Sequence, residues 1–395
     1  MRGRKTEGAI ADEADEADEA REALEVAAGW ALACSGRTAR AARRLLLERG
    51  SIPAVVSLSI REAVEIGQEP EEAVLPLLEP RSVPGIDEQL RRLSAAGARL
   101  IDLLDDEYPC LLRQIPDPPV LLFARGKRLD GVPAVAIVGS RRPSRSGLET
   151  ARRLAGDLSR AGLTIVSGFA RGIDHAAHQA ALEAGGRTVA VLGSGVDICY
   201  PEEHRALVPT LMASGTFLSE FPMGMRPQPF HFPIRNRVIA GIVPLVLVVE
   251  AAERSGSLIT ARHAADFGRD VAAVPGAVLT PHATGSNALL KDGAILVRSA
   301  DDVLAELQES QELQGLPRSA ARGTPLIPAL LERLGADPGA VYRALDPDDP
   351  RGPDALAAAT GLGPSRLSAA LVLLELEGLA TPLPGAVFVR RRDGD

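Results

Sequence analysis

The sequence predicts an α/β protein with a buried parallel sheet at its centre and small helical domains on either side. Two observations support this fold class. From residue 132 to about residue 303, short apolar runs alternate with amphipathic segments of helical length, which is typical of βαβ units. The regions before and after it have helical periodicity without such runs, and 395 residues are enough for two or three domains.

The central region contains the expected strands and helices of the sheet in strict alternation. The strands are predicted at 134–140, 163–168, 187–195, 216–221, 244–251, 269–276 and 294–300. The helices are predicted at 146–162, 172–186, 201–215, 233–243, 255–268 and 286–293. Together with a preceding helix and a proline-rich packed extension, they make a domain over 86–307.

The N-terminal region is expected to hold two different segments. Residues 1–20 contain ADEADEADEA, which predicts a solvated, disordered acidic tail; an acidic mimic of DNA is the alternative reading. Residues 21–85 predict a helical domain of short amphipathic helices that stop at Gly36, Gly50 and Gly67.

The C-terminal region predicts a linker and a small domain. Residues 308–325 are polar and rich in helix breakers, and residues 326–395 show three helical segments, 328–335, 354–361 and 364–379, followed by a hairpin at 381–391. This order is that of a winged-helix module.

Composition narrows the class of protein. The net charge of −8 argues against a uniformly basic nucleic-acid coat, so the local distribution of charge matters more. The three cysteines are scattered without a CxxC pair, which favours neither a disulfide framework nor zinc and suits a reducing cytosol. No apolar window reaches the length of a membrane span, so we expect a cytoplasmic protein.

The candidate site lies where the strands end, because open parallel sheets bind ligands at the carboxyl ends of their strands. The residues delivered there are Gly139, Ser140 and Arg141; Ser167, Gly168 and Arg171; Gly193 and Ser194; and Ser255, Gly256 and Ser257. Their backbone N–H groups, hydroxyls and helix N-termini favour an anionic oxygen. An arginine excess between 139 and 171 supports a phosphate cradle, although Arg152, Arg153 and Arg160 fit a solvated helix face.

The first loop, GSRRPSRSG, matches neither the GxGxxG dinucleotide fingerprint nor the GxxxxGK[ST] phosphate loop. The second strand also lacks the acid that would bind a ribose. An NAD enzyme and a P-loop ATPase are therefore disfavoured, and no cofactor is expected.

The stretch FHFPIRNRVIAG adds aromatic and basic side chains to the same sheet edge. Phe230, Phe232, Arg235, Asn236 and Arg237 belong to it, and Arg226 lies in the preceding loop. Arginines that follow a backbone and aromatics that stack on bases are the ingredients of a single-stranded nucleic-acid site. The alternative is that the phenylalanines are buried and the arginines pair with Glu220 or Glu250.

Two further groups contain residue types that can bind a metal or act as a nucleophile. His175 and His178 share a helix face but lack a third metal ligand, so no metal is expected, and Asp174 beside them is expected to fix the loop. Cys199 has no partner that would make it a nucleophile.

These motifs occur together in a known family. GSRRPSRSG, VSGFARGIDHAAHQAAL, AVLGSGVDICYPEEH, FPIRNRVIAG and ERSGSLITARHAADFGRDVAAVPG resemble, in this order, the DNA-processing protein A family (DprA/Smf). The resemblance implies an extended Rossmann-like fold that binds single-stranded DNA without hydrolysis, protects incoming strands and loads RecA recombinase in natural transformation, usually as a homodimer. It also implies that the N-terminal helical domain resembles a sterile alpha motif (SAM) domain.

The resemblance assigns residues as well. Arg141 corresponds to the phosphate-pocket arginine, and Arg235 and Arg237 occupy the FPxRNR motif. Ser167, Gly168, Ser255 and Gly256 would shape the anion pocket through backbone donors. Relatives often have a lysine before FPxRNR, where this chain offers Arg226.

Two alternative functions remain open. One is a nucleotide-processing enzyme similar to Lonely Guy-type phosphoribohydrolases, although VPGAVLTPHATGS lacks the paired glycines and glutamate of PGGxGTxxE. The other is a scaffold that kept the fold and lost DNA binding.

In the C-terminal domain, the expected recognition helix PSRLSAALVLLELE has one arginine and two glutamates, which favours a protein-interaction or structural role over DNA reading.

Overall fold

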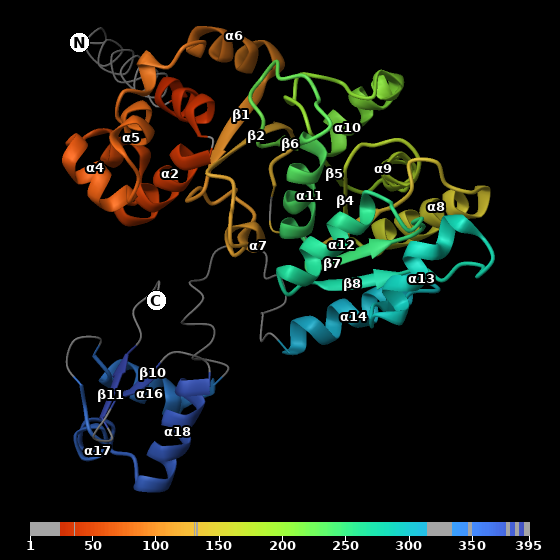
Figure 1. The fold of residues 1–395 in the computed structure, drawn as a ribbon. Coiled ribbons are helices and arrows are strands. Elements are labelled where there is room, and N and C mark those ends of the chain that lie inside the picture. The colour runs from red at the N-terminus through yellow and green to blue at the C-terminus, as the bar shows by residue number, and fades with distance from the viewer. Residues whose placement is uncertain are drawn as a thin grey trace, which may run out of the picture. The chain divides into compact units, whose positions relative to one another are not determined.

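The computed structural model describes residues 24–34, 36–129, 131, 133–313, 334–346, 350–376, 380–383 and 387–390 (Figure 1). The chain divides into two compact units, Met1–Pro317 and Arg318–Asp395. The predicted acidic tail and most of the helix predicted at 328–335 lie outside the described residues.

A nine-stranded sheet in the order β1-β2-β6-β5-β4-β3-β7-β8-β9 forms the centre of the first unit (Figure 1). The strands that the sequence predicted are β3 (Ala134–Val138), β4 (Thr164–Ser167), β5 (Thr188–Val191), β6 (Thr216–Ser219), β7 (Leu245–Val248), β8 (Asp270–Ala273) and β9 (Ile295–Leu296). All seven pair in parallel. The predicted parallel core is confirmed.

Two strands were missed in the segment interpreted as a packed extension. β1 (Ala98–Asp102) pairs antiparallel with β2 (Leu121–Gly126), and β2 pairs antiparallel with β6. Arg99 in β1 pairs with Glu107 and donates to the carbonyl of Gly126 at 2.9 Å. Arg99 interrupts the apolar pattern of this five-residue strand. Its partner Glu107 lies outside the strand, so the strand sequence does not reveal the pair.

Helices cover both faces of the sheet. One face packs against α8 (Arg145–Arg160), α9 (Ile173–Glu183) and α14 (Ala300–Leu313); the other packs against α11 (His231–Ile242) and α12 (Ser257–Asp266). Alternate residues of β3 enter the two cores, Val135 and Ile137 on the first face and Ala136 and Val138 on the second, as the period of a strand requires. The remaining helices of this domain are α7 (Cys110–Arg113), η2 (Glu202–Leu207), α10 (Val208–Ser214), η3 (Pro281–Ala283) and α13 (Thr284–Lys291).

The N-terminal helices share the second core rather than building a separate one. They are the helix Leu24–Ala33, α2 (Gly36–Arg49), α3 (Ile52–Val56), α4 (Ile60–Gly67), α5 (Glu71–Leu78), η1 (Pro80–Ser82) and α6 (Ile86–Ala96). Trp30 is fully buried there and donates through Nε1 to the carbonyl of Leu77 at 2.9 Å. The helices and the sheet therefore form one compact unit.

The second unit contains α16 (Ala336–Ala344), α17 (Pro353–Thr360), α18 (Pro364–Leu376) and the antiparallel hairpin of β10 (Ala380–Leu383) and β11 (Val387–Arg390). This arrangement agrees with the predicted winged-helix order. Before it, α14 continues to Leu313, into the segment predicted as a linker.

No individual helix in the described ranges combines the length and apolar character needed to cross a membrane, although a bent pair, Pro353–Thr360 with Pro364–Glu375, reaches them when taken together.

Candidate functional site

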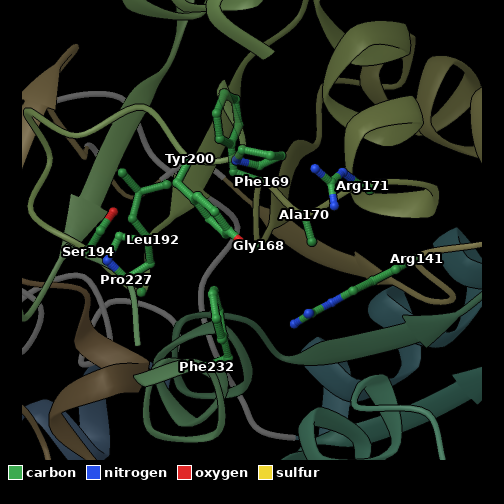
Figure 2. A pocket seen from close by; sticks show the side chains of 12 residues that line it. Arg141, Gly168, Phe169, Ala170, Arg171, Leu192, Ser194, Tyr200, Pro227 and Phe232 are labelled. Atoms are coloured by element: carbon green, nitrogen blue, oxygen red, sulfur yellow. The ribbon is translucent and has the colours of Figure 1, made fainter. Parts of the chain in front are cut away.

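A pocket opens at the carboxyl ends of β4 and β5, where the sequence analysis placed the site. It is an open hollow with about 450 Å³ of empty space, a volume that includes open solvent (Figure 2). Its lining residues are Arg141, Gly168, Phe169, Ala170, Arg171, Leu192, Gly193, Ser194, Tyr200, Pro201, Pro227 and Phe232. Six of the predicted site residues, from three strand ends and the helix α11, are thus brought together.

Arg141 is an exposed cation of this pocket outside any carboxylate pair among the described residues. Figure 2 shows its side chain extending toward the ring of Phe232, and its guanidinium carbon lies 5.0 Å from the centre of that ring. The ion pairs found among the described residues do not include Arg141. The backbone below it is fixed, since the amide of Ser140 donates to the carbonyl of Glu250 at 2.7 Å. The arginine therefore presents donors to solvent over an aromatic face.

Arg235 lies beneath the pocket and holds its floor. Its side chain is only 3% exposed, and its Nη1 donates to the carbonyls of Gly168 and Val191, at the ends of β4 and β5. Burial lowers the pKa of Arg235 to about 10, so it stays charged at neutral pH. The same guanidinium lies 5.9 Å from the ring of Phe232.

Asp174 fixes the loop after β4, as predicted. Its Oδ2 accepts from the amides of Gly168 at 3.1 Å and Ala170 at 3.4 Å. Burial raises the pKa of this carboxyl, and the nearby Arg235 opposes the shift. A Cβ on Gly168 would lie 2.6 Å from Arg235 Nη1 and 2.7 Å from Asp174 Oδ2, so only glycine fits between the two charged groups.

The residue after Gly168 adopts a conformation that is rare outside glycine. Phe169 has φ 56°, and its amide donates to His178 Nε2 at 3.3 Å. Burial lowers the pKa of His178 to about 3, which keeps the ring neutral. Strained backbone at a pocket wall is a common feature of binding sites.

The sequence predicted that Arg235 and Arg237 contact phosphate at the same sheet edge as Arg141, but neither guanidinium is free to do so in the structure. Arg235 is buried, as described above. Arg237, two residues further along α11, pairs with Glu220 and donates to the carbonyl of Asp117, on the side of the helix that faces the N-terminal helices. The physical reason is the helical period, which turns residues two apart to opposite sides. The alternative reading that paired an arginine with Glu220 is therefore correct for Arg237.

We call the group formed by Arg43, Asp117, Glu220 and Arg237 the α11 seam. Arg43 of α2 donates to the carbonyl of Pro116 at 2.8 Å and pairs with Asp117. Burial raises the pKa of Glu220 to about 7 even though Arg237 lowers it. The seam joins the N-terminal helices to α11.

Other predicted residues shape the framework without lining the pocket. Ser167 is fully buried and donates to the carbonyl of Ile137 at 2.6 Å. Asn236 donates to the carbonyl of Gly256 at 3.2 Å, and the hydroxyls of Ser255 and Ser257 lie 2.8 Å apart. Neither these residues nor Gly139 and Ser140 belong to the pocket lining. The predicted anion role of Ser255, Gly256 and Ser257 at this pocket is therefore not supported by their position.

The point between β3 and β7, where strand order reverses, is occupied by the protein itself. Glu250 is 7% exposed, and its carboxylate accepts from the amide of Ser144 at 2.9 Å and from the hydroxyl of the same residue. This carboxylate sits at the N-terminus of α8, which is where Rossmann proteins bind a phosphate. The pocket at β4 and β5 is thus displaced from the usual dinucleotide position.

Arg226 and Phe230 extend the surface beside the pocket. Arg226 is exposed, and Phe230 is 63% exposed at the start of α11. Gln89 of α6 anchors their loop through two hydrogen bonds of 2.9 Å with the backbone of Met223. Arg92 of the same helix donates to Asp197 at 3.0 Å, and Asp197 accepts from the amide of Gly224 in this loop at 2.8 Å.

Six lining residues were not predicted as site residues: Phe169, Ala170, Leu192, Tyr200, Pro201 and Pro227. Tyr200 is 45% exposed, and its ring centre lies 6.0 Å from that of Phe232. Its place in the turn CYPEEH after a strand end was the available signal. Among the described residues, no group of three or more His, Cys, Asp or Glu side chains is arranged to hold a metal ion.

Comparisons with known proteins agree with this architecture. The family described as DNA recombination-mediator protein A matches residues 99–308, and the DprA winged helix domain matches residues 315–386. The DNA processing protein DprA of Streptococcus pneumoniae is 47% identical over 207 residues, 52% of this chain and 73% of that protein. Protein Smf of Synechocystis is 38% identical over 315 residues, 73% of this chain and 79% of that protein.

A solved structure extends the likeness to three dimensions. The X-ray structure of DNA processing protein A from Streptococcus pneumoniae is 38% identical, covers 70% of this chain and 96% of its own, and superposes with a TM-score of 0.63. Membership of one family therefore explains the parallel core, the C-terminal module and the order of the motifs. The chain belongs to the DNA-processing protein A (DprA/Smf) family.

Proposed function

We propose that this protein binds single-stranded DNA at the β4–β5 pocket without sequence preference and acts as a binding protein rather than an enzyme. The observation that carries the proposal is Arg141, an exposed guanidinium outside any carboxylate pair among the described residues, placed over Phe232 at the mouth of a pocket. A guanidinium fork is suited to a phosphate oxygen. The aromatic walls supply the second half of the site.

Aromatic faces at the pocket favour unpaired bases over a duplex. Phe232 and Tyr200 line the pocket, and Phe230 lies exposed beside it. Stacking on such rings requires a base whose face is free, and it tolerates any sequence because every base has a π-face. Arg141, and Arg226 in the neighbouring loop, then follow the phosphates.

The experiment compares single- and double-stranded DNA of equal length by fluorescence anisotropy over a salt series. We expect tighter binding to the single strand, and we expect Arg141→Ala to weaken it roughly tenfold, with a salt slope smaller by about 0.7, the value for one phosphate contact on a single strand. Arg153→Ala is the matched control, because Arg153 lies on α8 and pairs with Asp157 at 3.8 Å. Equal binding by Arg141→Ala and wild-type protein would refute the site.

The wider role that we propose follows from membership of the family. The protein protects incoming strands and loads a RecA-type recombinase during DNA uptake, as a cytoplasmic homodimer. Light scattering tests the dimer, and RecA filament formation on coated single strands tests the loading. A monomer, or filaments that form no faster with the protein, would contradict these parts and leave DNA binding intact.

For the C-terminal unit we propose a protein-contacting or structural role. Arg366 at the start of α18 pairs with Asp337, while Val372 and Leu373 on the same helix are exposed by 53% and 40%. An apolar exposed stretch suits a protein partner better than a phosphate backbone. Arg366→Ala is expected to leave the affinity for DNA unchanged.

A further inference from the structure

A second arginine of the pocket is held by a carboxylate. Arg171, in the loop after β4, lines the pocket and is labelled beside Ala170 in Figure 2. Its Nε and Nη2 both donate to the carboxylate of Glu203 in η2, the latter at 2.8 Å. The pair is exposed, with 57% of the Arg171 and 52% of the Glu203 side chain accessible.

This pairing uses two of the donors that a phosphate would bind. A guanidinium binds carboxylate and phosphate with the same two-pronged geometry, so a phosphodiester oxygen competes with Glu203 for Nε and Nη2 of Arg171. The hydrogen bond from Arg171 lowers the pKa of Glu203, so its carboxylate is ionised at neutral pH. Its two parallel hydrogen bonds place this pair at the strong end of exposed ion pairs, about 1 kcal/mol, and its exposure to solvent allows it to exchange partners.

The surroundings keep Glu203 close to the pocket. Tyr200 and Pro201, which line the pocket, lie just before η2. The following residue, His204, stacks on His175 of α9 with ring centres 4.1 Å apart. Burial lowers the pKa of His204 to about 4 and also lowers the pKa of His175, so both rings are neutral at physiological pH. The contact between these rings does not involve the carboxylate of Glu203.

We propose that Glu203 is a built-in competitor for Arg171: it occupies this arginine until a DNA phosphate displaces it, and it thereby limits the affinity of the pocket. The proposal rests on the proposed function, because it concerns the regulation of the same site. Binding then uses Arg141 directly and Arg171 after exchange. The displaced carboxylate stays near the strand and repels it, which weakens binding further.

The chain supplies a matched control one residue away. Glu202 pairs with Arg205 at 2.9 Å, and these side chains are 81% and 73% exposed. Arg205 does not line the pocket. Glu202→Gln therefore removes the same charge from the same turn without releasing a pocket arginine, and it measures the general effect of one lost negative charge.

The experiment measures anisotropy with an oligothymidine strand over a salt series for wild type, Glu203→Gln, Glu202→Gln, Arg171→Ala and the double variant Glu203→Gln/Arg171→Ala. We expect Glu203→Gln to bind up to about fivefold more tightly, the ratio an exposed ion pair can supply, with a salt slope larger by about 0.7. Glu202→Gln should show a clearly smaller gain. With Arg171→Ala in the background, the Glu203→Gln gain should fall to that of Glu202→Gln.

Two results would overturn the competitor role: a gain from Glu203→Gln no larger than that from Glu202→Gln, or a gain that persists in the Arg171→Ala background. Glu203→Ala serves as a second variant, and loss of binding by both Glu203 variants also counts against the role. The failures can be separated. If wild-type protein does not bind the strand, the proposed function fails together with the competitor; if Arg141→Ala weakens binding but Glu203→Gln matches its control, only the competitor fails.

Discussion

The pocket and the α11 seam both depend on arginines, but they hold them in different ways. At the pocket, Arg141 is exposed above Phe232, outside the carboxylate pairs of the described residues. In the seam, Arg237 is committed to Glu220 and to the carbonyl of Asp117. The first kind of arginine is available to a ligand, and the second joins parts of the protein.

Arg235 is the intermediate case, and it explains how the two regions are linked. It is as buried as a core residue, yet it touches the pocket from below through Gly168 and Phe232. It shares α11 with Arg237. A buried guanidinium is tolerated only when its donors are satisfied, and the carbonyl oxygens at two strand ends meet that need. Burial and carboxylate partners, rather than residue type, decide which arginine is available to a ligand.

The largest effect on the free energy of unfolding is expected from replacing the buried Arg235. Arg235→Ala leaves the carbonyls of Gly168 and Val191 without this donor and Asp174 buried without its nearby positive charge. We expect the free energy of unfolding to fall by about 3–5 kcal/mol, as for other broken buried charge networks. Urea unfolding followed by circular dichroism measures it.

Arg142→Ala is the control for this prediction, because Arg142 is exposed in the loop next to Arg141. Its effect on stability should stay within about 0.5 kcal/mol. If both variants unfold at the same urea concentration, burial does not separate the two kinds of arginine.

A smaller effect is expected in the seam, as a dependence of stability on pH. Burial raises the pKa of Glu220 from its ordinary value of 4.5 to about 7, with Asp117 adding to the rise and Arg237 opposing it. The folded state therefore holds this proton more tightly than the unfolded state does. The stabilisation that protonated Glu220 adds to the folded state is fully present below pH 4.5 and is lost as the pH rises to about 7.

Glu220→Gln tests this titration, because the amide keeps an acceptor for Arg237 without titrating. Relative to wild type, the variant should gain stability between pH 5 and pH 8, on the order of 2 kcal/mol. Thermal unfolding midpoints at both pH values give the difference. A constant difference between the two proteins across this range would show that Glu220 does not titrate there.

The smallest effect on the fold is expected at the exposed aromatic side chain. Phe230→Ala removes a ring that is 63% exposed, so stability should change by less than about 0.5 kcal/mol. Affinity for single-stranded DNA should nevertheless fall by about 1 kcal/mol, the lower range for stacking on one base. Ile234→Ala, at another exposed apolar position of α11, should change neither quantity. Equal DNA affinity of the two variants would remove Phe230 from the proposed interface.

The predictions from sequence succeeded where local pattern is decisive. The seven parallel strands follow from uninterrupted apolar runs such as Leu245–Val248, which a doubly covered sheet requires. Asp174 could be assigned to the loop because of its place at the start of a helix. β1 was missed because Arg99 interrupts its apolar pattern and finds its partner at Glu107. β2 was missed because its apolar run was interpreted as part of a packed extension.

The sequence by itself determined the parallel core, the strand ends that meet at the pocket, the family and the arginine excess around Arg141. The tertiary structure decided which arginines are free. Arg235, Arg237 and Arg141 look alike in a sequence, because the free energy of a charged side chain depends on its burial and on partners far away in the chain. The carbonyl of Val191 and the carboxylates of Glu220 and Glu203 are such partners, and only folding brings them to the arginines that they hold.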